Sequence, residues 1–197
     1  MSERTRQLVV PVMAFLFGLV ALGVAAVLTL TPQGREVTAA SVGGPFRLVA
    51  HDGREVSERD FLGAPHLVFF GFTHCPDICP TKLFEISQIL EASGERGRDL
   101  RALFISVDPE RDTPALLKSY TGSFDERIVG LTGSPEQVDA AVKAYRAYYK
   151  KVPTSGGDYT MEHTAVVYLM DRQGRFVGLF DTARPKEVAA QELTGLL

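Results

Sequence analysis

Cys75 and Cys79 are the residues whose type and spacing could do chemistry, and they are the only cysteines of this 197-residue chain. They lie in the segment GFTHCPDICP (71–80), directly after the apolar run LVFF. Thiolates attack disulfides and bind soft metal ions such as Cu(I) and Zn(II). The pair therefore indicates redox chemistry or a soft-metal site, and its spacing alone does not choose between the two.

The residues around the cysteines predict the elements that position them. An unbroken apolar run over 67–73 is typical of a strand buried on both faces. A helix is predicted to begin about Pro80 and to run through Ala92, because its apolar residues recur at helical spacing. Cys75 then lies in the loop before the helix and Cys79 in its first turn. The positive end of the helix dipole favours thiolates, so we expect lowered thiol pKa values there.

A metal site needs more than two sulfurs, and a histidine is the expected third ligand. The chain has 4 histidines: His51, His66, His74 and His163. His163 is the candidate, because it is predicted to open the strand that runs to Met170, after a polar loop over 150–162 from which a ligand could move. A hydrogen-bonded structural role fits His163 equally well. The side chain of His74 is expected to point away from that of Cys75.

Strands and helices alternate along the rest of the chain. Strands are predicted at 46–50, 54–56, 100–107, 127–131, 164–170 and 175–180, and helices at 113–123, 134–148 and 185–197. The segment DPERD (108–112) is predicted to be a capped, solvated loop. This order predicts an α/β fold with a mixed sheet flanked by helices.

The amino-terminal region predicts a transmembrane helix. No charged residue occurs between Leu8 and Leu30, and as a helix this run would span roughly 34 Å, enough to cross a bilayer. Arg4 and Arg6 precede it, so residues 1–7 are expected to stay in the cytoplasm while the rest is exported. The alternative is a signal peptide, cleaved among the small residues inside the run.

A polar linker is predicted over 31–44 and one folded domain over 45–197. With 45% hydrophobic and 23% charged residues, the composition is that of a globular protein, and the net charge of −3 argues against a nucleic-acid partner. Outside the cytoplasm, neighbouring cysteines oxidise unless a reductant or a metal ion holds them. Export therefore makes the oxidation state of Cys75 and Cys79 a variable of the function.

Three ordered segments resemble the motifs of the SCO/SenC family, whose members assist assembly of the copper centre of cytochrome c oxidase. They are GFTHCPDICP (71–80), SVDPERDTP (106–114) and YTMEHT (159–164). The resemblance covers residues 45–197. One departure is Glu162, because the family has Asp before the histidine; the carboxylate remains but its reach changes.

The resemblance implies a thioredoxin-like fold and a copper site formed by Cys75, Cys79 and His163, with Cu(I) as the expected ion and Cu(II) as a further state. The implied partners are the copper-bearing subunit of the oxidase, a copper donor chaperone and a thiol reductant. The expected location is the inner membrane, crossed once, with the domain facing the periplasm. The mitochondrial intermembrane space is the alternative, but the amino terminus lacks an evident transit peptide.

Two functions are consistent with these residues. The first is a membrane-anchored copper chaperone for the copper centre of cytochrome c oxidase. The alternative is an exported thiol–disulfide oxidoreductase, in which Cys75 and Cys79 are a redox-active, disulfide-forming pair that reduces cysteines of the oxidase subunit. One chain could be primarily a metallochaperone and still carry this enzymatic activity. The Cys-x3-Cys spacing and the absence of tryptophan argue against an ordinary thioredoxin, and a metal or redox sensor is a third class.

Overall fold

The computed structural model describes residues 42–197 and Phe17. Residues Ser41–Leu197 form a compact unit. Apart from Phe17, the predicted cytoplasmic tail (1–7), the transmembrane helix (8–30) and most of the linker (31–44) lie outside the described residues, and all three stay predictions. Within the described part of the chain, no helix combines the length and apolar character that a membrane crossing requires.

The sheet of this domain is mixed, as predicted. In pairing order its strands are β2 (Glu55–Ser57), β1 (Arg47–Ala50), β5 (Ile128–Thr132), β4 (Arg101–Ser106), β3 (His66–Gly71), β8 (Val167–Met170) and β9 (Phe176–Phe180). The central strands β3, β4 and β5 run parallel, and the outer pairs are antiparallel. The carboxyl ends of β3 and β4 therefore lie side by side, which brings the loops that follow them together.

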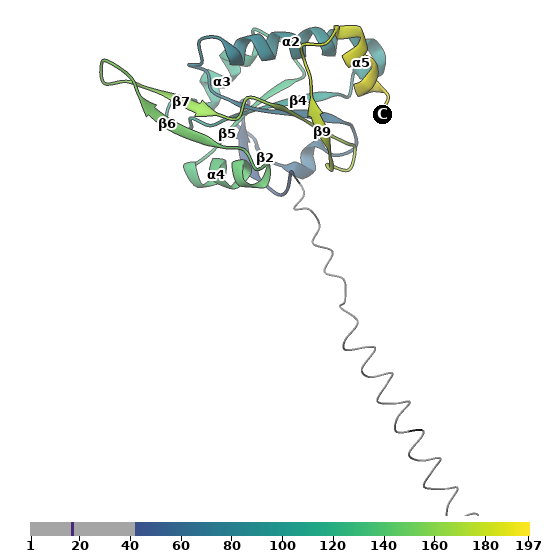
Figure 1. Cartoon of the computed structure of the whole chain (residues 1–197), viewed down its shortest axis with the longest axis horizontal. Helices are drawn as coiled ribbons and strands as arrows, with labels where there is room; N and C mark the ends of the chain where they lie inside the picture. The colour runs from purple at the N-terminus through teal and green to yellow at the C-terminus, as the bar shows by residue number, and fades with distance from the viewer. Residues whose placement is uncertain (1–16, 18–41) are drawn as a thin grey trace, which may run out of the picture. The chain divides into compact units, whose positions relative to one another are not determined.

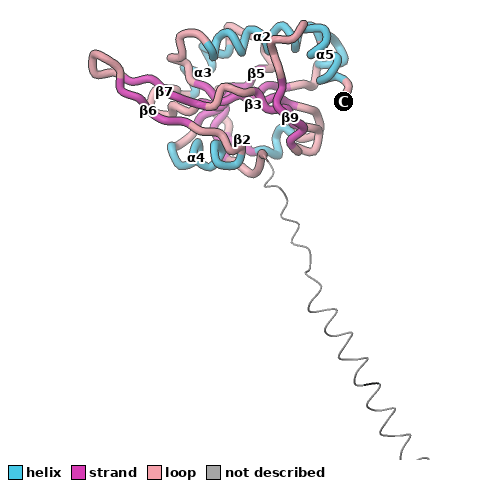
Figure 2. Tube along the Cα trace, in the orientation of Figure 1, coloured by secondary structure: helices cyan, strands magenta, loops and turns pink. Residues whose placement is uncertain are grey.

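Helices cover both faces of the sheet. They are α2 (Ile78–Ala92), α3 (Pro114–Thr121), α4 (Pro135–Ala144) and α5 (Lys186–Thr194), with the short 3-10 helices η1 (Glu58–Phe61) and η2 (Gly94–Gly97). Figures 1 and 2 show α2, α3 and α5 over one face and α4 over the other. Thr113 and Ser134 cap α3 and α4 by accepting backbone N–H bonds, and a proline follows each cap.

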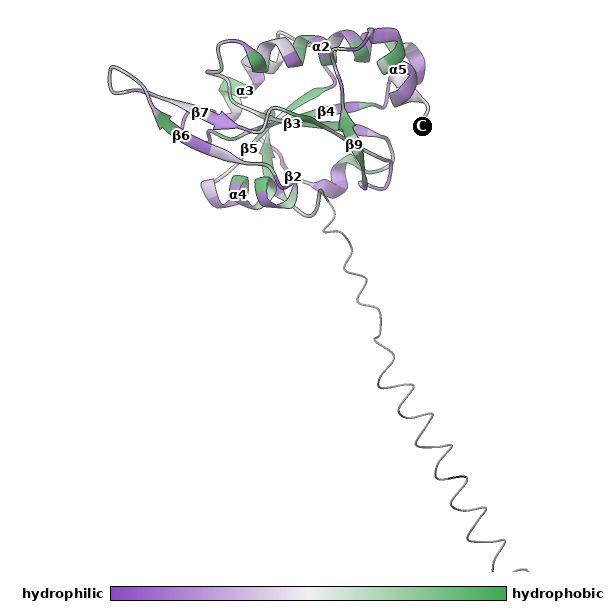
Figure 3. Ribbon diagram, in the orientation of Figure 1, coloured by the Kyte–Doolittle hydropathy of each residue, from purple (hydrophilic) through white to green (hydrophobic). Residues whose placement is uncertain are grey.

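Strand β3 is the centre of the hydrophobic core. All its residues are buried, because β4 and β8 pair with its two edges and helices cover its faces. Phe69 packs beside Phe104 of β4 on one face, whereas Phe70 contacts Tyr145, next to α4, on the other. Figure 3 shows the hydrophobic colour concentrated in these central strands. The cysteine segment thus follows a strand whose position is fixed on every side.

A separate antiparallel hairpin consists of β6 (Tyr149–Pro153) and β7 (Tyr159–His163). The predicted polar loop over 150–162 is therefore wrong. β6 is mostly exposed and β7 is mostly half-buried, and their polar sequences lack the regular apolar alternation that marks a strand. The prediction that His163 opens the next strand is wrong as well, because His163 ends β7 and β8 begins only at Val167.

Helix α4 is shorter than the predicted helix over 134–148. It ends at Ala144, and Arg146 has the left-handed φ of 53°. The backbone N–H of Ala147 donates to the carbonyl of Val142 at 2.9 Å, which closes the last turn. The backbone conformation of Arg146 therefore ends the helix, although the residue type gives no such signal.

Candidate metal centre

The two cysteines lie where the sequence placed them. Cys79 is in the first turn of α2 and fully buried, while Cys75 is half-buried in the loop before the helix, and both thiols are free. The backbone N–H of Cys79 donates to Sγ of Cys75 at 3.4 Å. Asp77, at the N-cap, makes no side-chain bond to the helix. The Cys75 sulfur therefore accepts one of the free N–H groups at the start of α2.

His163 completes a cluster with the cysteines. Its Nε2 lies 3.7 Å from Sγ of Cys79, and its Nδ1 lies 3.0 Å from the carbonyl oxygen of Thr164. A carbonyl only accepts, so Nδ1 carries the proton in this bond and Nε2 presents its lone pair to the sulfur. The rings of Phe69 and Phe72 meet the imidazole edge-on, with centroids 6.3 and 5.7 Å away. The histidine is thus held with the correct nitrogen toward the cysteines.

The ligand atoms of Cys75, Cys79 and His163 all lie within 4.8 Å of one another. Sulfur and imidazole ligands lie about 2.0–2.3 Å from a transition metal, so two ligands of one ion are at most about 4.6 Å apart. The three ligand atoms are thus near the spacing that one ion requires. Two sulfurs and one imidazole suit Cu(I) or Zn(II), so the donor set fits the predicted copper.

Burial sets the protonation of this cluster. It raises the pKa of the Cys79 thiol well above the ordinary value, and the neighbouring Cys75 and the Asp112 carboxylate act in the same direction. The predicted lowering by the helix terminus is wrong for Cys79, because desolvation outweighs it. Burial also lowers the pKa of His163, which keeps the imidazole neutral and able to bind a metal ion. A metal ion bound by Cys79 would therefore displace a proton.

The other histidines take structural positions. Nδ1 of His51 accepts the backbone N–H of Gly130 at 3.0 Å, so this ring holds β5. His66 is buried in β3, and its ring lies 6.3 Å from that of Phe61. His74 is half-exposed beside Thr73 and is outside the ligand cluster, as predicted.

Asp112 is a site residue that the sequence prediction missed. It is fully buried and Asp108 is 2% exposed, so the prediction of a solvated loop over 108–112 is wrong. Asp112 accepts the backbone N–H of Thr73 at 3.0 Å and the Thr73 hydroxyl at 2.6 Å. These bonds fix the start of the cysteine loop. The signal in the sequence was the position of the segment directly after β4, at the sheet edge where α/β sites form.

The family model SCO1/SenC matches residues 34–197. The chain belongs to the SCO1/SenC family. A SCO1/SenC relative, Protein SenC of Rhodobacter capsulatus, is 38% identical over 185 residues, which are 88% of this chain and 83% of that protein. The chain spans about half the length of the mitochondrial SCO1 homologues of Arabidopsis thaliana and human that it matches, at 45% and 52% of their lengths.

Solved Sco structures have the same fold. That of Bradyrhizobium japonicum ScoI with copper bound has a TM-score of 0.77 and 53% identity, and the match covers 80% of this chain and 100% of ScoI. A structure that identifies a disulfide switch in BsSco, a member of the Sco family of cytochrome c oxidase assembly proteins, has a TM-score of 0.62 and 26% identity over 80% of this chain and 93% of BsSco. The predicted thioredoxin-like fold is confirmed for the described domain.

Proposed function

We propose that this protein is a copper chaperone that binds copper through Cys75, Cys79 and His163 and delivers it to the copper-bearing subunit of cytochrome c oxidase. The observation that carries the proposal is the convergence of these three ligand atoms within 4.8 Å. They come from two distant parts of the chain, the start of α2 and the end of β7. Affinity for the ion therefore depends on the folded domain.

The burial of the ligands suits an ion that is passed on. Cys79 is fully buried, whereas Cys75 is half-buried, so the ion would be reached from the Cys75 side. An incoming thiolate could replace Cys75 first and the other ligands afterwards, with Cu(I) never leaving a sulfur ligand. The copper-bound ScoI structure supports copper as the cargo, and the description of BsSco as an oxidase assembly protein supports the target.

The decisive experiment is copper stoichiometry with X-ray absorption on the reduced protein. The expected result is one Cu(I) per chain with a shell of two sulfurs and one nitrogen. His163→Ala should lose the nitrogen and bind copper more weakly. His74→Ala is the matched control, because His74 adjoins Cys75 in the sequence but lies outside the ligand cluster. Absence of bound copper, or equal affinity in His163→Ala, would contradict the proposal.

Thiol–disulfide exchange is the second candidate, favoured by the two free thiols and by the greater exposure of Cys75. Cys75 thiolate would attack a target disulfide and release one target thiolate. Cys79 would then attack the Cys75 sulfur, release the second target thiolate and leave a Cys75–Cys79 disulfide. The target gains two electrons, which an external thiol reductant must return to the pair. The disulfide switch described for BsSco supports this chemistry.

Oxidase assembly in two variants separates the candidates. If copper delivery is the main function, cells with His163→Ala and cells with Cys75→Ser should both assemble an oxidase that lacks its copper centre. If reduction is the main function, His163→Ala should keep assembly and Cys75→Ser should lose it. Cys79→Ser should then trap a mixed disulfide with the oxidase subunit, visible on a non-reducing gel.

The proposed location is the inner membrane, with residues 8–30 as a single anchor and the domain in the periplasm. A copper donor chaperone and a thiol reductant would then reach the site from the periplasm. Reporter fusions after residue 44 should be active only if the reporter folds outside the cytoplasm. Release of a shorter, soluble chain would show instead that the amino-terminal segment is cleaved.

A further inference from the structure

The segment Ser106–Asp112, here termed the bridging segment, contacts the cysteine loop through Asp112. The Asp112 carboxylate accepts the N–H and the hydroxyl of Thr73, at 3.0 and 2.6 Å. The Ser106 hydroxyl donates to Asp112 at 2.6 Å and accepts the backbone N–H of Asp108 at 3.0 Å. The Ser106 hydroxyl thus links Asp112, which holds the cysteine loop, to the backbone of Asp108.

The same segment contacts the hairpin through Asp108 and Arg111. Arg111 pairs with Asp108 at 2.5 Å, and the Tyr159 hydroxyl donates to Asp108 at 2.9 Å. Arg111 also donates to the carbonyl of Tyr159 at 3.0 Å, and its guanidinium carbon lies 3.7 Å from the Tyr159 ring centroid. Asp108 is buried and the Arg111 side chain is 18% exposed, so these contacts are little screened by solvent.

Tyr159 and His163 are the first and last residues of β7. The hairpin is not part of the seven-stranded sheet, and Figure 1 shows it extending away from the body of the domain. A two-stranded hairpin is marginally stable by itself, so contacts with the rest of the domain must hold β7 in place. At the carboxyl end of β7, Phe69 of β3 contacts the imidazole of His163. The Asp108–Arg111–Tyr159 contacts link β7 to the end of β4.

We propose that Asp108 and Arg111 are positioning residues for His163: they hold β7, through Tyr159, at the place where His163 reaches the sulfur of Cys79. This inference rests on the proposed copper site. The bridging segment would then fix the position of the cysteine ligands relative to His163. It holds the cysteine loop with Asp112 and the histidine strand with Asp108.

Asp108→Asn is the test, and Glu110→Gln is its matched control. Both changes neutralise one carboxylate of the bridging segment that faces the hairpin. Asp108 is buried, whereas Glu110 is 63% exposed and pairs, within residues 42–197, with Lys151, which is 45% exposed and whose ammonium lies 3.8 Å from the Tyr159 ring centroid. Exposed pairs contribute little. Tyr159→Phe is a milder variant, because it removes only the hydroxyl and keeps the ring against Arg111.

Cu(I) affinity, measured by competition with a chelator, should fall about tenfold in Asp108→Asn, as for other residues that orient a ligand. In Tyr159→Phe the Cu(I) affinity should fall on the order of fivefold. In Glu110→Gln it should equal that of the wild type. Amide exchange of β7 in the metal-free protein should accelerate in Asp108→Asn but not in Glu110→Gln. In a His163→Ala background, Asp108→Asn should have no further effect on copper affinity.

The outcomes separate this inference from the function on which it rests. Weak binding by His163→Ala with normal binding by both Asp108→Asn and Tyr159→Phe would overturn the positioning role. An additional loss in the double variant would overturn it too, because Asp108 would then act on the whole fold. If His163→Ala binds copper normally, the three-ligand site is wrong, and any role of Asp108 in copper binding is wrong with it.

Discussion

Gly71 ends β3 at the point where the sulfur of Cys79 lies. A Cβ at this position would be 2.8 Å from Sγ of Cys79 and 2.5 Å from the ring of Phe104. Both distances are shorter than carbon makes with such atoms, so a side chain here would displace the sulfur or the ring. The missing side chain therefore makes room for the buried thiol.

Gly71→Ala should accordingly lower the free energy of unfolding by about 1–3 kcal/mol and weaken copper binding. Urea denaturation and chelator competition would measure the two effects. Gly178→Ala is the control, because a Cβ in that strand of the same sheet has no atom within 4 Å. Equal stability of the two variants would show that Cys79 and Phe104 adjust without cost.

The two thiols should differ in reactivity. Cys79 is fully buried and its pKa is raised by burial, so it is protonated and shielded at pH 8, whereas Cys75 is half-buried. Iodoacetamide should therefore modify Cys75 first in the reduced, metal-free protein, by more than about tenfold in rate. Tandem mass spectrometry of the tryptic peptide 60–82, which carries both cysteines, would locate the modification and measure this. Loading with Cu(I) should protect both residues, and faster modification of Cys79 would contradict the described burial.

His66 should make the stability of the domain depend on pH. Burial lowers its pKa in the folded state below the ordinary 6.5. Between the two values the unfolded chain binds more protons, so the free energy of unfolding rises with pH and falls as pH drops below about 6.5. Urea denaturation of the metal-free protein at pH 7.5 and 5.5 would show the loss. His66→Leu should reduce the loss without abolishing it, because the pKa of His163 is also lowered.

The His66→Leu variant checks this assignment. If the free energy of unfolding of His66→Leu falls between pH 7.5 and 5.5 as much as that of the wild type, groups other than His66 bind the protons on unfolding.

Arg146 offers a stabilising substitution. Its φ of 53° lies in the left-handed region, which costs a residue with a Cβ roughly 1 kcal/mol and a glycine almost nothing. Arg146→Gly should therefore raise the free energy of unfolding by about 0.5–1 kcal/mol, seen as a higher Tm. Lys143→Gly, in the last turn of α4, should have the opposite sign, because there the φ is helical. A lower Tm for Arg146→Gly would mean that the side chain makes contacts that outweigh the strain.

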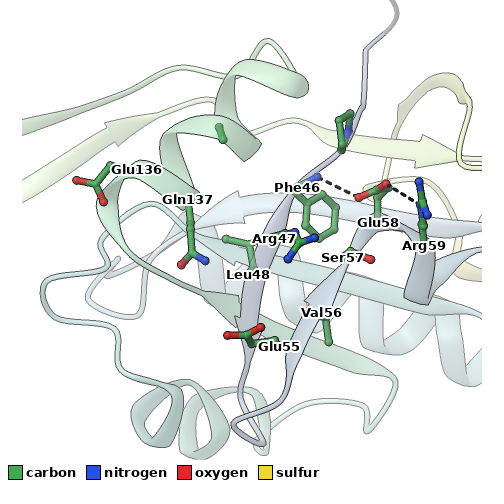
Figure 4. Close-up of a pocket in the computed structure, with 12 residues that line it drawn as sticks. Phe46, Arg47, Leu48, Glu55, Val56, Ser57, Glu58, Arg59, Glu136 and Gln137 are labelled. Carbon is green, nitrogen blue, oxygen red and sulfur yellow. Dashed lines mark hydrogen bonds and ion pairs between the residues drawn. The ribbon is translucent and has the colours of Figure 1, made fainter.

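An open pocket is separate from the cysteine cluster, with which it shares no lining residue. Residues of β1, β2, η1 and α4 line it, among them Phe46, Leu48, Glu55, Glu58 and Glu136 (Figure 4). Glu58 accepts the backbone N–H of Phe46 at 3.1 Å, so that carboxylate is already used by the fold. None of the predicted ligand residues lines this pocket.

Local patterns in the sequence were sufficient for most of the elements and for the cysteine pair. An apolar run predicts β3, helical spacing predicts α2, and covalent proximity keeps Cys75 and Cys79 together whatever the rest of the chain does. The polar strands β6 and β7 were missed, because their sequences have no regular apolar alternation. The end of α4 was missed because Arg146 is not a residue type that favours a left-handed conformation.

What the sequence by itself determined is the chemistry that is available: two thiols at a helix start, and a histidine that could join them. Only the tertiary structure decided that His163 faces Cys79 from the end of an added hairpin, and that Asp108 and Asp112 are buried links and not solvated caps. The tertiary structure also reversed the expected direction of the pKa shift of Cys79, because burial raises this pKa. These properties depend on distance across the fold and on removal from water, and neither quantity is encoded in the spacing of residues along the chain.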